Sequence, residues 1–367
     1  MLMNPRLTGL RCIRCAQVLP PGDYFEGCPA CLRAGDPASL ECLYEPAPAG
    51  AAALPLPVLD AITLGEGATP CLDMPALAGA AHVGRLWIKC ESANPTGSHK
   101  DRMSAQLVSR AKLAGARRVA AASSGNAGVS LAAYCAAAGL EADIAIMRGC
   151  PPLQRAAMLA FGARLTEFED SLARWPHVAR LCREEGAFAG TNYLNPPVGT
   201  HAYGVEGYKP IAAEILQTCG LPTDIVVPAA RGDLIWGIAL GWEALRRAGA
   251  IERLPRLHAV EPFARLSRAR AAGHARGQWL GDTAQYSTAG GTCTLQSLAA
   301  LARTGGMPVE AGDQAAGRAR DMLASLGIAA ELSSAAALAA LPALRLAGAL
   351  DAESRVVAVL TSDGRRG

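Results

Sequence analysis

Short apolar runs alternate along the chain with longer segments whose apolar residues recur every three to four positions. The runs predict β-strands at Leu86–Lys89, Arg118–Ala121, Asp143–Met147, Ile225–Val227, Leu257–Val260 and Val356–Leu360. The segments between them predict helices at 101–114, 126–139, 207–219, 232–248, 309–325 and 334–347. Because strands that alternate with helices pair in parallel, this order predicts an α/β fold with parallel sheets covered on both faces. Ligands of such folds bind at the C-terminal ends of strands, beside helix N-termini.

The composition narrows the class of protein. The 367 residues suffice for two domains and a small module, and 51% hydrophobic against 18% charged residues exclude disorder as the dominant state. A net charge of +3 without any basic block argues against a nucleic-acid partner, so we expect a small-molecule partner. The apolar runs are too short for a membrane span, and isolated cysteines lie inside apolar segments. Both features predict a cytoplasmic protein.

Four of the twelve cysteines lie close to the N-terminus. Cys12, Cys15, Cys28 and Cys31 form two CxxC pairs separated by 12 residues, and each pair can place two thiolates on one tetrahedral Zn²⁺. Four thiolates leave no position open for water, so the spacing predicts a structural zinc in a ribbon-like module over 1–42; the alternative is four unrelated thiols. The Pro- and Ala-rich segment 43–58 predicts a linker.

The 35 basic residues include only four lysines, which makes each of them informative. Lys112 lies on an amphipathic helix and is expected on its solvated face. Lys89 and Lys209 are surface charges or supporting groups. Lys100 stands in NPTGSHKDR (94–102), a turn-rich loop that leads directly into a helix. Since the positive end of the helix dipole favours a neutral, nucleophilic amine, Lys100 is suited to covalent chemistry with a carbonyl group.

Several ordered motifs carry a family resemblance. NPTGSHKDR resembles the cofactor-lysine motif of the fold-type II pyridoxal-phosphate (PLP) enzymes, and within them of the threonine synthases. The resemblance continues through LGEGATP (64–70), SSGNAG (123–128), EGYKPIAAEI (206–215), ELSSAAALAAL (331–341) and VVAVLTSDG (356–364). A zinc-ribbon-like start also recurs in some threonine synthases. Together these motifs are specific, whereas any one of them alone is weak.

The resemblance implies an architecture as well as a cofactor. It implies two parallel-sheet α/β domains of the tryptophan synthase β type: a large PLP-binding domain formed by 59–104 and 205–367, and a small mobile domain formed by 105–204. It further implies PLP as cofactor, an amino-acid substrate and a homodimer.

The same resemblance implies roles for individual residues. Lys100 would hold the cofactor and then remove the substrate's α-proton. Asn126 would bond the cofactor's phenolate oxygen, although Ser and Asn are also ordinary helix-capping residues. Binding of the substrate and its carboxylate would fall to residues of three loops: Thr96, Ser98, Ser123, Ser124, Gly125 and Asn192.

The expected phosphate loop departs from the family pattern. The stretch from Val227 to Asp233 stands where the family has several glycines, and only Gly232 remains. The loop residues Ala230, Arg231, Gly232 and Asp233 are still expected to bind the cofactor at a helix N-terminus. Asp233 would repel a dianion unless it caps the helix, so Arg231 is expected to supply attraction. His99, where the family usually has Phe, is a second candidate.

Thr361 is the residue that the resemblance places at the cofactor's pyridine nitrogen. A hydroxyl stabilises a protonated ring less than a carboxylate would, which favours elimination from Cβ. Asp363 follows two positions later, and we expect it to be an exposed residue of the C-terminal turn.

A second departure concerns the substrate. Threonine synthases have a segment resembling Asn-Ser-x-Asn-Pro, closely followed by an arginine, that binds the phosphate of O-phosphohomoserine. Here the segment begins Asn192-Tyr193, the arginine is absent, and about five residues are inserted before Glu206. A leaving phosphate needs charge-assisted donors, and His201 or Arg155 could take the place of the missing ones.

Three functions follow from these observations. The first is a PLP-dependent lyase or replacement enzyme, with threonine synthase as the first choice. Its runner-up is a β-elimination or β-replacement enzyme that acts on serine- or threonine-type substrates and makes a non-standard amino acid or 2-oxo acid. The second function is a non-catalytic regulatory protein that keeps the fold. A dinucleotide-dependent dehydrogenase is weaker, because no GxGxxG follows the first strands.

Overall fold

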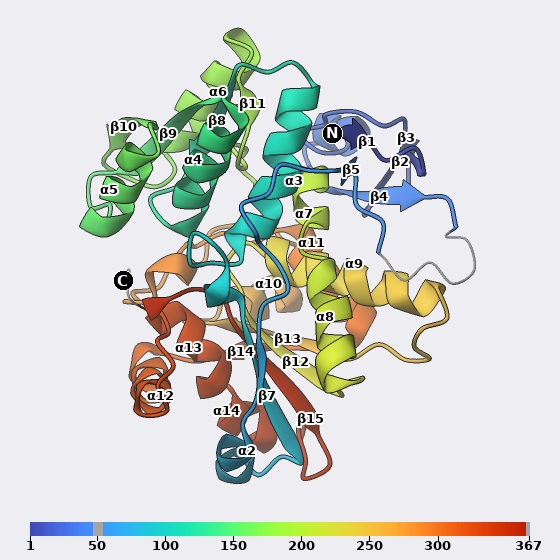
Figure 1. Ribbon diagram of the computed structural model, residues 1–367, viewed down its shortest axis with the longest axis vertical. Helices are drawn as coiled ribbons and strands as arrows, with labels where there is room; N and C mark the ends of the chain where they lie inside the picture. Colours follow the sequence, from blue (N-terminus) through green and yellow to red (C-terminus); the bar gives the residue numbers. More distant parts are fainter. Residues whose placement is uncertain (47–53, 365–367) are drawn as a thin grey trace. The chain divides into compact units, whose positions relative to one another are not determined.

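The computed structural model describes residues 1–46 and 54–364, which separate into two compact units (Figure 1). The first unit contains Met1–Glu66, Lys100–Tyr208 and Thr294–Gln296, and the second contains Gly67–His99, Lys209–Cys293 and Ser297–Gly367. The cysteine-rich segment thus shares a unit with 100–208. Residues 47–53, part of the predicted linker, lie outside the described residues.

A parallel sheet forms the centre of the first unit. Its strand order is β10-β9-β8-β11, with β8 at Arg118–Ala122, β9 at Glu141–Met147, β10 at Arg164–Phe168 and β11 at Phe188–Ala189. Because side chains alternate along a strand, Val119 packs with α3 (Lys100–Leu113), α4 (Asn126–Ala138) and α5 (Pro152–Ala160), whereas Ala120 packs with α6 (Arg174–Glu184). Both faces of this sheet are therefore covered.

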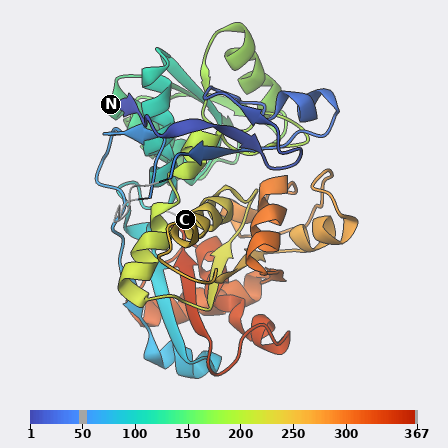
Figure 2. The same ribbon diagram turned by 90° about the vertical axis from the view of Figure 1, so that its right-hand side faces the viewer.

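The N-terminal segment builds a small antiparallel module in the same unit (Figure 2). Its sheet has the order β3-β2-β4, with β2 at Leu7–Cys12, β3 at Val18–Leu19 and β4 at Leu40–Tyr44, and it carries α1 (Pro29–Arg33). A separate pair joins β1 (Leu2–Met3) to β5 (Val58–Leu59). The fully buried Tyr203, from α7 (Ala202–Glu206), completes the module's core. Its hydroxyl oxygen accepts a hydrogen bond from the amide of Gly22 (3.0 Å).

An ionic contact also attaches the module to α3. The carboxylate of Asp23 accepts two hydrogen bonds from the Arg110 guanidinium (2.8 and 2.6 Å), and Nε2 of His201 lies 3.3 Å from it. Burial alone would raise the pKa of Asp23. The nearby His201 and the hydrogen bonds from Arg110 outweigh burial and lower that pKa to about 2. The ionised carboxylate is therefore the form that the folded protein stabilises.

This contact predicts how stability depends on pH. Since the pKa of Asp23 is lowered on folding, its contribution is complete above the unfolded pKa and is lost as the pH falls from about 4 through about 2. Asp23→Asn should reduce the free energy of unfolding by about 2 kcal/mol at pH 7 and flatten its decline below pH 4. Urea unfolding across this pH range measures both effects. Asp73→Asn, which breaks the exposed pair with Arg85, is the control; equal losses in both variants would contradict the prediction.

The second unit is built on a six-stranded sheet. Its order is β14-β13-β12-β15-β7-β6, and only the edge strand β6 (Cys71–Asp73) is antiparallel. The parallel strands are β7 (Arg85–Cys90), β12 (Asp224–Pro228), β13 (Arg256–Glu261), β14 (Pro308–Glu310) and β15 (Arg355–Leu360). The helices are α2 (Pro75–Ala81), α8 (Pro210–Cys219), α9 (Asp233–Arg247), α10 (Leu266–Ala272), α12 (Asp313–Ser325), α13 (Leu332–Ala339) and α14 (Leu341–Leu346). α11 (Leu295–Thr304) begins in the first unit and ends in this one.

The strand predictions are confirmed, whereas three of the helix predictions need correction. Each of the six predicted strands is present, with ends within two residues of the prediction. The predicted helix 207–219 begins only at Pro210, where proline is tolerated in a first turn. The segment 309–325 opens as strand β14, and its helix starts at Asp313. The segment 334–347 is two helices, since Pro342 occupies the first turn of a new one.

The three lysines other than Lys100 differ in their exposure to solvent. Lys112 is exposed, as predicted for a solvated helix face. Lys89 is fully buried in β7, where its ammonium donates to Oε2 of Glu214 and to the carbonyl of Thr69, both at 2.6 Å. Lys209 is also buried. Among the described residues, none of the helices is long and apolar enough to span a bilayer.

Candidate active site

The lysine-bearing loop is fixed by pairing with the segment that follows β15. Ser98 and Ser362 form an antiparallel bridge. The amide of His99 donates to the carbonyl of Thr361, and the amide of Asp363 donates to that of Gly97, both at 2.9 Å. This pairing ends directly before Lys100, the first residue of α3. The loop 97–99, which leads directly to Lys100, is therefore held by the segment 361–363.

His99 and Asp363 flank this pairing, and the expectation for Asp363 changes. Nδ1 of His99 lies 3.0 Å from the carbonyl oxygen of Thr361, so this nitrogen carries the proton and His99 lies at the Thr361 end of the loop. Asp363 is 7% exposed, so the prediction of an exposed turn residue is wrong. The physical reason is its main-chain bond to Gly97, which folds the segment after β15 back onto the lysine loop.

The serine-rich loop lies at the C-terminal end of β8 and leads into α4. Asn126 is the first residue of that helix and is partly exposed. The hydroxyl oxygen of Ser123 accepts bonds from the amides of Gly125 (3.3 Å) and Gly128 (3.0 Å). Ser124 is buried, and its hydroxyl oxygen accepts from the amide of Met147 and from Arg174. Its side chain therefore braces the loop against β9 and α6.

The predicted phosphate loop connects β12 to α9 in the second unit. Gly232 immediately precedes α9 with φ +96, which favours glycine. A Cβ at this position would lie 2.3 Å from Cβ of Ser297, so the loop packs too closely for any other residue. Arg231 and Asp233 are both partly buried. Burial lowers the pKa of Arg231, and Asp233 partly opposes this shift.

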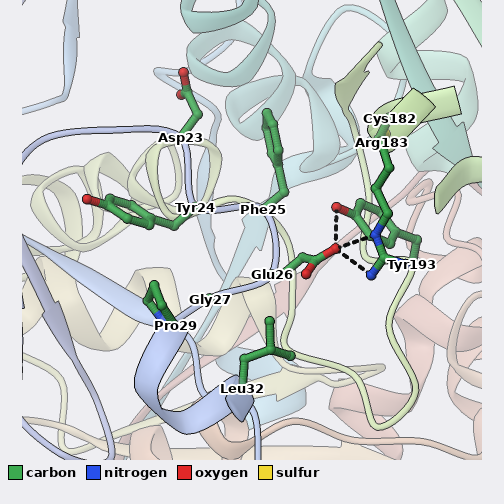
Figure 3. A pocket seen from close by; sticks show the side chains of 10 residues that line it. All are labelled: Asp23, Tyr24, Phe25, Glu26, Gly27, Pro29, Leu32, Cys182, Arg183 and Tyr193. Carbon is green, nitrogen blue, oxygen red and sulfur yellow. Dashed lines mark hydrogen bonds and ion pairs between the residues drawn. The ribbon is translucent and has the colours of Figure 1, made fainter. Parts of the chain in front are cut away.

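Asn192 and Tyr193 are buried in a separate loop of the first unit. The Asn192 amide donates to the carbonyl of Leu194 and accepts from the amide of Val198, both at 2.9 Å, so the 3% exposed side chain closes its own loop. The hydroxyl of Tyr193 donates to Glu26 (3.1 Å), which also binds Arg183 (Figure 3). These three side chains line a pocket of about 310 Å3 beside the cysteine module.

The remaining predicted contacts are less accessible. Thr96 is 6% exposed and Ser98 is fully buried, so neither side chain offers an open surface. The sequence reasoning missed a network that fixes the neighbouring 67–69 segment. The amide of Ala68 donates to Glu214, the partner of Lys89, and the hydroxyl of Thr69 donates to Glu91 (2.7 Å). The signal in the sequence for this network was Lys89, a lysine within an otherwise apolar strand.

The four N-terminal cysteines converge. Their sulfur atoms all lie within 4.8 Å of one another, and Sγ of Cys12 is 3.7 Å from that of Cys31, as is Sγ of Cys15 from that of Cys28. Four sulfurs at about 2.3 Å from a tetrahedral Zn²⁺ stand about 3.8 Å apart. The donor set therefore fits zinc in both chemistry and spacing.

Comparison with known proteins identifies the family. Residues 62–362 match the family described as pyridoxal-phosphate dependent enzyme. The chain belongs to this family. It is 30% identical to the threonine synthase of Methanocaldococcus jannaschii, over 84% of this chain and 78% of the relative, and 30% identical to that of Halalkalibacterium halodurans, over 83% and 84%.

Solved structures agree on the fold of the pyridoxal-phosphate family. Maize serine racemase superposes with a TM-score of 0.70 at 21% identity, over 81% of this chain and 88% of that one. A fungal L-serine ammonia-lyase from Rhizomucor miehei gives 0.68 at 21% identity, over 81% and 94%. The protein is thus a fold-type II PLP enzyme by sequence and by architecture.

The residues fit the cofactor that this family uses. Lys100 places a lysine side chain at the start of α3, and Gly232, where the loop packs too closely for a side chain, precedes α9. The first-turn amides of α9 are donors suited to a phosphate. Thr361 adjoins the lysine loop, since its carbonyl accepts from the amide of His99 (2.9 Å), and a threonine hydroxyl is a group that could face a ring nitrogen.

Proposed function

We propose that the protein is a PLP-dependent carbon–oxygen lyase or replacement enzyme that acts on a small amino acid activated at Cβ or Cγ. The observation that carries the proposal is the placement of Lys100. Its loop is locked by pairing with 361–363, and it begins a helix in a chain whose residues 62–362 match the PLP-dependent family. When bound, PLP supplies an electron sink for negative charge at Cα.

The proposal assigns roles to individual residues of this chain. Lys100 would hold the cofactor and then move the proton at Cα. Asn126 would donate to the phenolate oxygen. The Ser123 hydroxyl and the amides around Gly125 would bind the substrate carboxylate, since the N-terminus of α4 favours an anion. Gly232 and the amides of 231–234 would bind the cofactor phosphate, and the Thr361 hydroxyl would face the ring nitrogen.

Threonine-synthase chemistry, which converts O-phosphohomoserine to threonine and phosphate, has the support of the 30% identical relatives. One observation favours a second candidate, β-elimination or β-replacement on serine- or threonine-type substrates. The segment where threonine synthases bind phosphate has its Asn192 amide closed on its own loop, and Tyr193 is directed to Glu26. Neither side chain is set up as a donor to a leaving phosphate.

Substrate competition tests this choice. We expect O-phosphohomoserine to have a lower kcat/KM than an O-substituted serine or threonine, because a phosphate at Cγ would lack charge-assisted donors. Side-by-side assays of phosphate, 2-oxo acid and amino-acid products measure the ranking, with Lys100→Ala as the inactive control. Efficient release of phosphate and threonine from O-phosphohomoserine would overturn the second candidate and establish threonine-synthase activity.

For the N-terminal module, the proposal is a structural zinc bound by Cys12, Cys15, Cys28 and Cys31. Support comes from the sulfur spacing and from the four-thiolate set itself, which fills all four positions of a tetrahedral zinc and leaves none open for water. A closed site of this kind stabilises the fold and takes no part in the chemistry at Lys100.

A further inference from the structure

Arg265 is a fully buried cation that the sequence motifs do not single out. It precedes α10 in the second unit, and its side chain is 0% exposed. Burial lowers the pKa of this guanidinium, and the opposite charge of Glu261 acts against the shift. A buried arginine is retained at this cost only where its donors have partners.

The partners of Arg265 are carbonyl oxygens of two loops. One terminal nitrogen donates to the carbonyl of Ala229 (2.6 Å), at the start of the proposed phosphate loop. The other donates to the carbonyls of Thr288 (3.0 Å) and Gly290. Ala229 is held from its other side as well, because its amide donates to the carbonyl of Val260 (2.8 Å). The position of the phosphate loop is thus fixed at Ala229.

The nearest carboxylate is engaged elsewhere. Oε2 of Glu261 is 3.8 Å from Nε of Arg265, which makes an ion pair without a hydrogen bond. Its two oxygens accept instead from the amides of Arg265, Leu266 and Ser267 and from the Ser267 hydroxyl, which caps the start of α10. The terminal donors of Arg265 are therefore directed to main-chain carbonyls.

The bond from Arg265 to the Ala229 carbonyl also sets the direction of the next amide, that of Ala230. In a planar trans peptide the C=O and the following N–H point in opposite directions. Since the Ala229 carbonyl points at Arg265, the amide of Ala230 points away from it, on the side of the loop opposite the buried guanidinium. We propose that Arg265 is a positioning residue for the cofactor phosphate: it orients the Ala229–Ala230 peptide so that the Ala230 amide joins the first-turn amides of α9 as a donor to the dianion. This inference rests on the proposed PLP site.

The proposal explains how a loop with a single glycine can bind phosphate. A glycine-rich loop turns its amides inward through backbone freedom. Here Gly232 supplies one such position, and a side chain behind the loop fixes the orientation upstream of it. Arg231, which the sequence suggested as the compensating charge, lies within the loop, whereas Arg265 acts from behind it.

The test compares PLP with pyridoxal, which lacks the phosphate. Arg265→Met should lower the affinity for PLP at least about tenfold while changing that for pyridoxal much less, because only PLP would lose a hydrogen bond to a charged group. Arg265→Lys, which keeps a cationic donor, should recover part of the loss. Equilibrium dialysis measures both ligands. Inorganic phosphate should raise the thermal midpoint of the apo wild type more than that of Arg265→Met.

Arg270→Met is the matched control, because Arg270 lies on α10 and, among the described residues, its guanidinium hydrogen-bonds only to the carbonyl of Gly306 (3.4 Å). It should keep the wild-type ratio of PLP to pyridoxal affinity. If Arg265→Met does not fold, the ratio is read from Arg265→Lys. An equal loss for both ligands, or an unchanged ratio, overturns the inference about Arg265. A wild type that binds neither ligand overturns the proposed function instead.

Discussion

Lys100→Ala is expected to abolish turnover while leaving the protein folded. The variant removes the proposed acid–base group, so kcat should fall by about 10³-fold or more, and the visible absorption of bound PLP should be lost. The fold should persist, since Lys100 is partly exposed at the first position of α3 and lies outside the hydrophobic cluster to which α3 contributes. Such positions change stability by about 0.5 kcal/mol or less. Activity assays, an absorbance spectrum and urea unfolding of the same preparation measure all three.

Chemical trapping distinguishes the four lysines directly. Borohydride reduction of the PLP-loaded protein, followed by peptide mapping, should find the cofactor's carbon skeleton on Lys100. Lys112→Ala is the control, because Lys112 is exposed on the same helix and should retain activity. We expect no label on Lys89 or Lys209, because both ammonium groups are buried. A label on either of them would contradict the assignment.

The fold could be predicted where apolar periodicity alone decides it. The six strands of the prediction are central, buried on both faces and rich in Val, Ile and Ala, so their pattern survives without tertiary information. The helix starts at Pro210 and Asp313 were not predictable, because the residues before each of them continue the helical pattern of apolar positions. A proline interrupts the first pattern, and a strand pairing interrupts the second. Val309 illustrates this: it becomes a strand only because it pairs with Val260. The antiparallel edge strand β6 also depends on its partner.

Candidate residues were recognisable in the sequence where chemistry and local turns coincide, as at Lys100, Asn126 and Gly232. Residues that act through distant partners were not. Asp363 is buried because its amide reaches Gly97, which lies 266 positions earlier in the chain. Arg265 contacts the carbonyl of Ala229, 36 positions away, and no local pattern marks it. A single sequence shows which groups can do chemistry but does not show which long-range contacts fix them.

Zinc removal is the second change with a large expected effect. Structural zinc contributes roughly 10–16 kcal/mol to the folding of small zinc-binding peptides, so a module with few core residues depends on its metal. Wild type should contain about one Zn²⁺ per chain, and the Cys12→Ser, Cys28→Ser variant should contain none. Hydrogen exchange at β2 and β4 should accelerate in that variant while β12 stays protected, because β12 belongs to the second unit.

Cys42→Ser is the control for this experiment, since Cys42 lies on β4 outside the four-sulfur cluster. It should keep its zinc and its slow exchange. Equal metal content in the wild type and the double variant would contradict the site. Loss of zinc with unchanged turnover would show that the metal stabilises the module and stays outside the chemistry. Loss of both together would place the module's contacts, through Asp23 and Arg110 to α3, in the support of Lys100 at the other end of that helix.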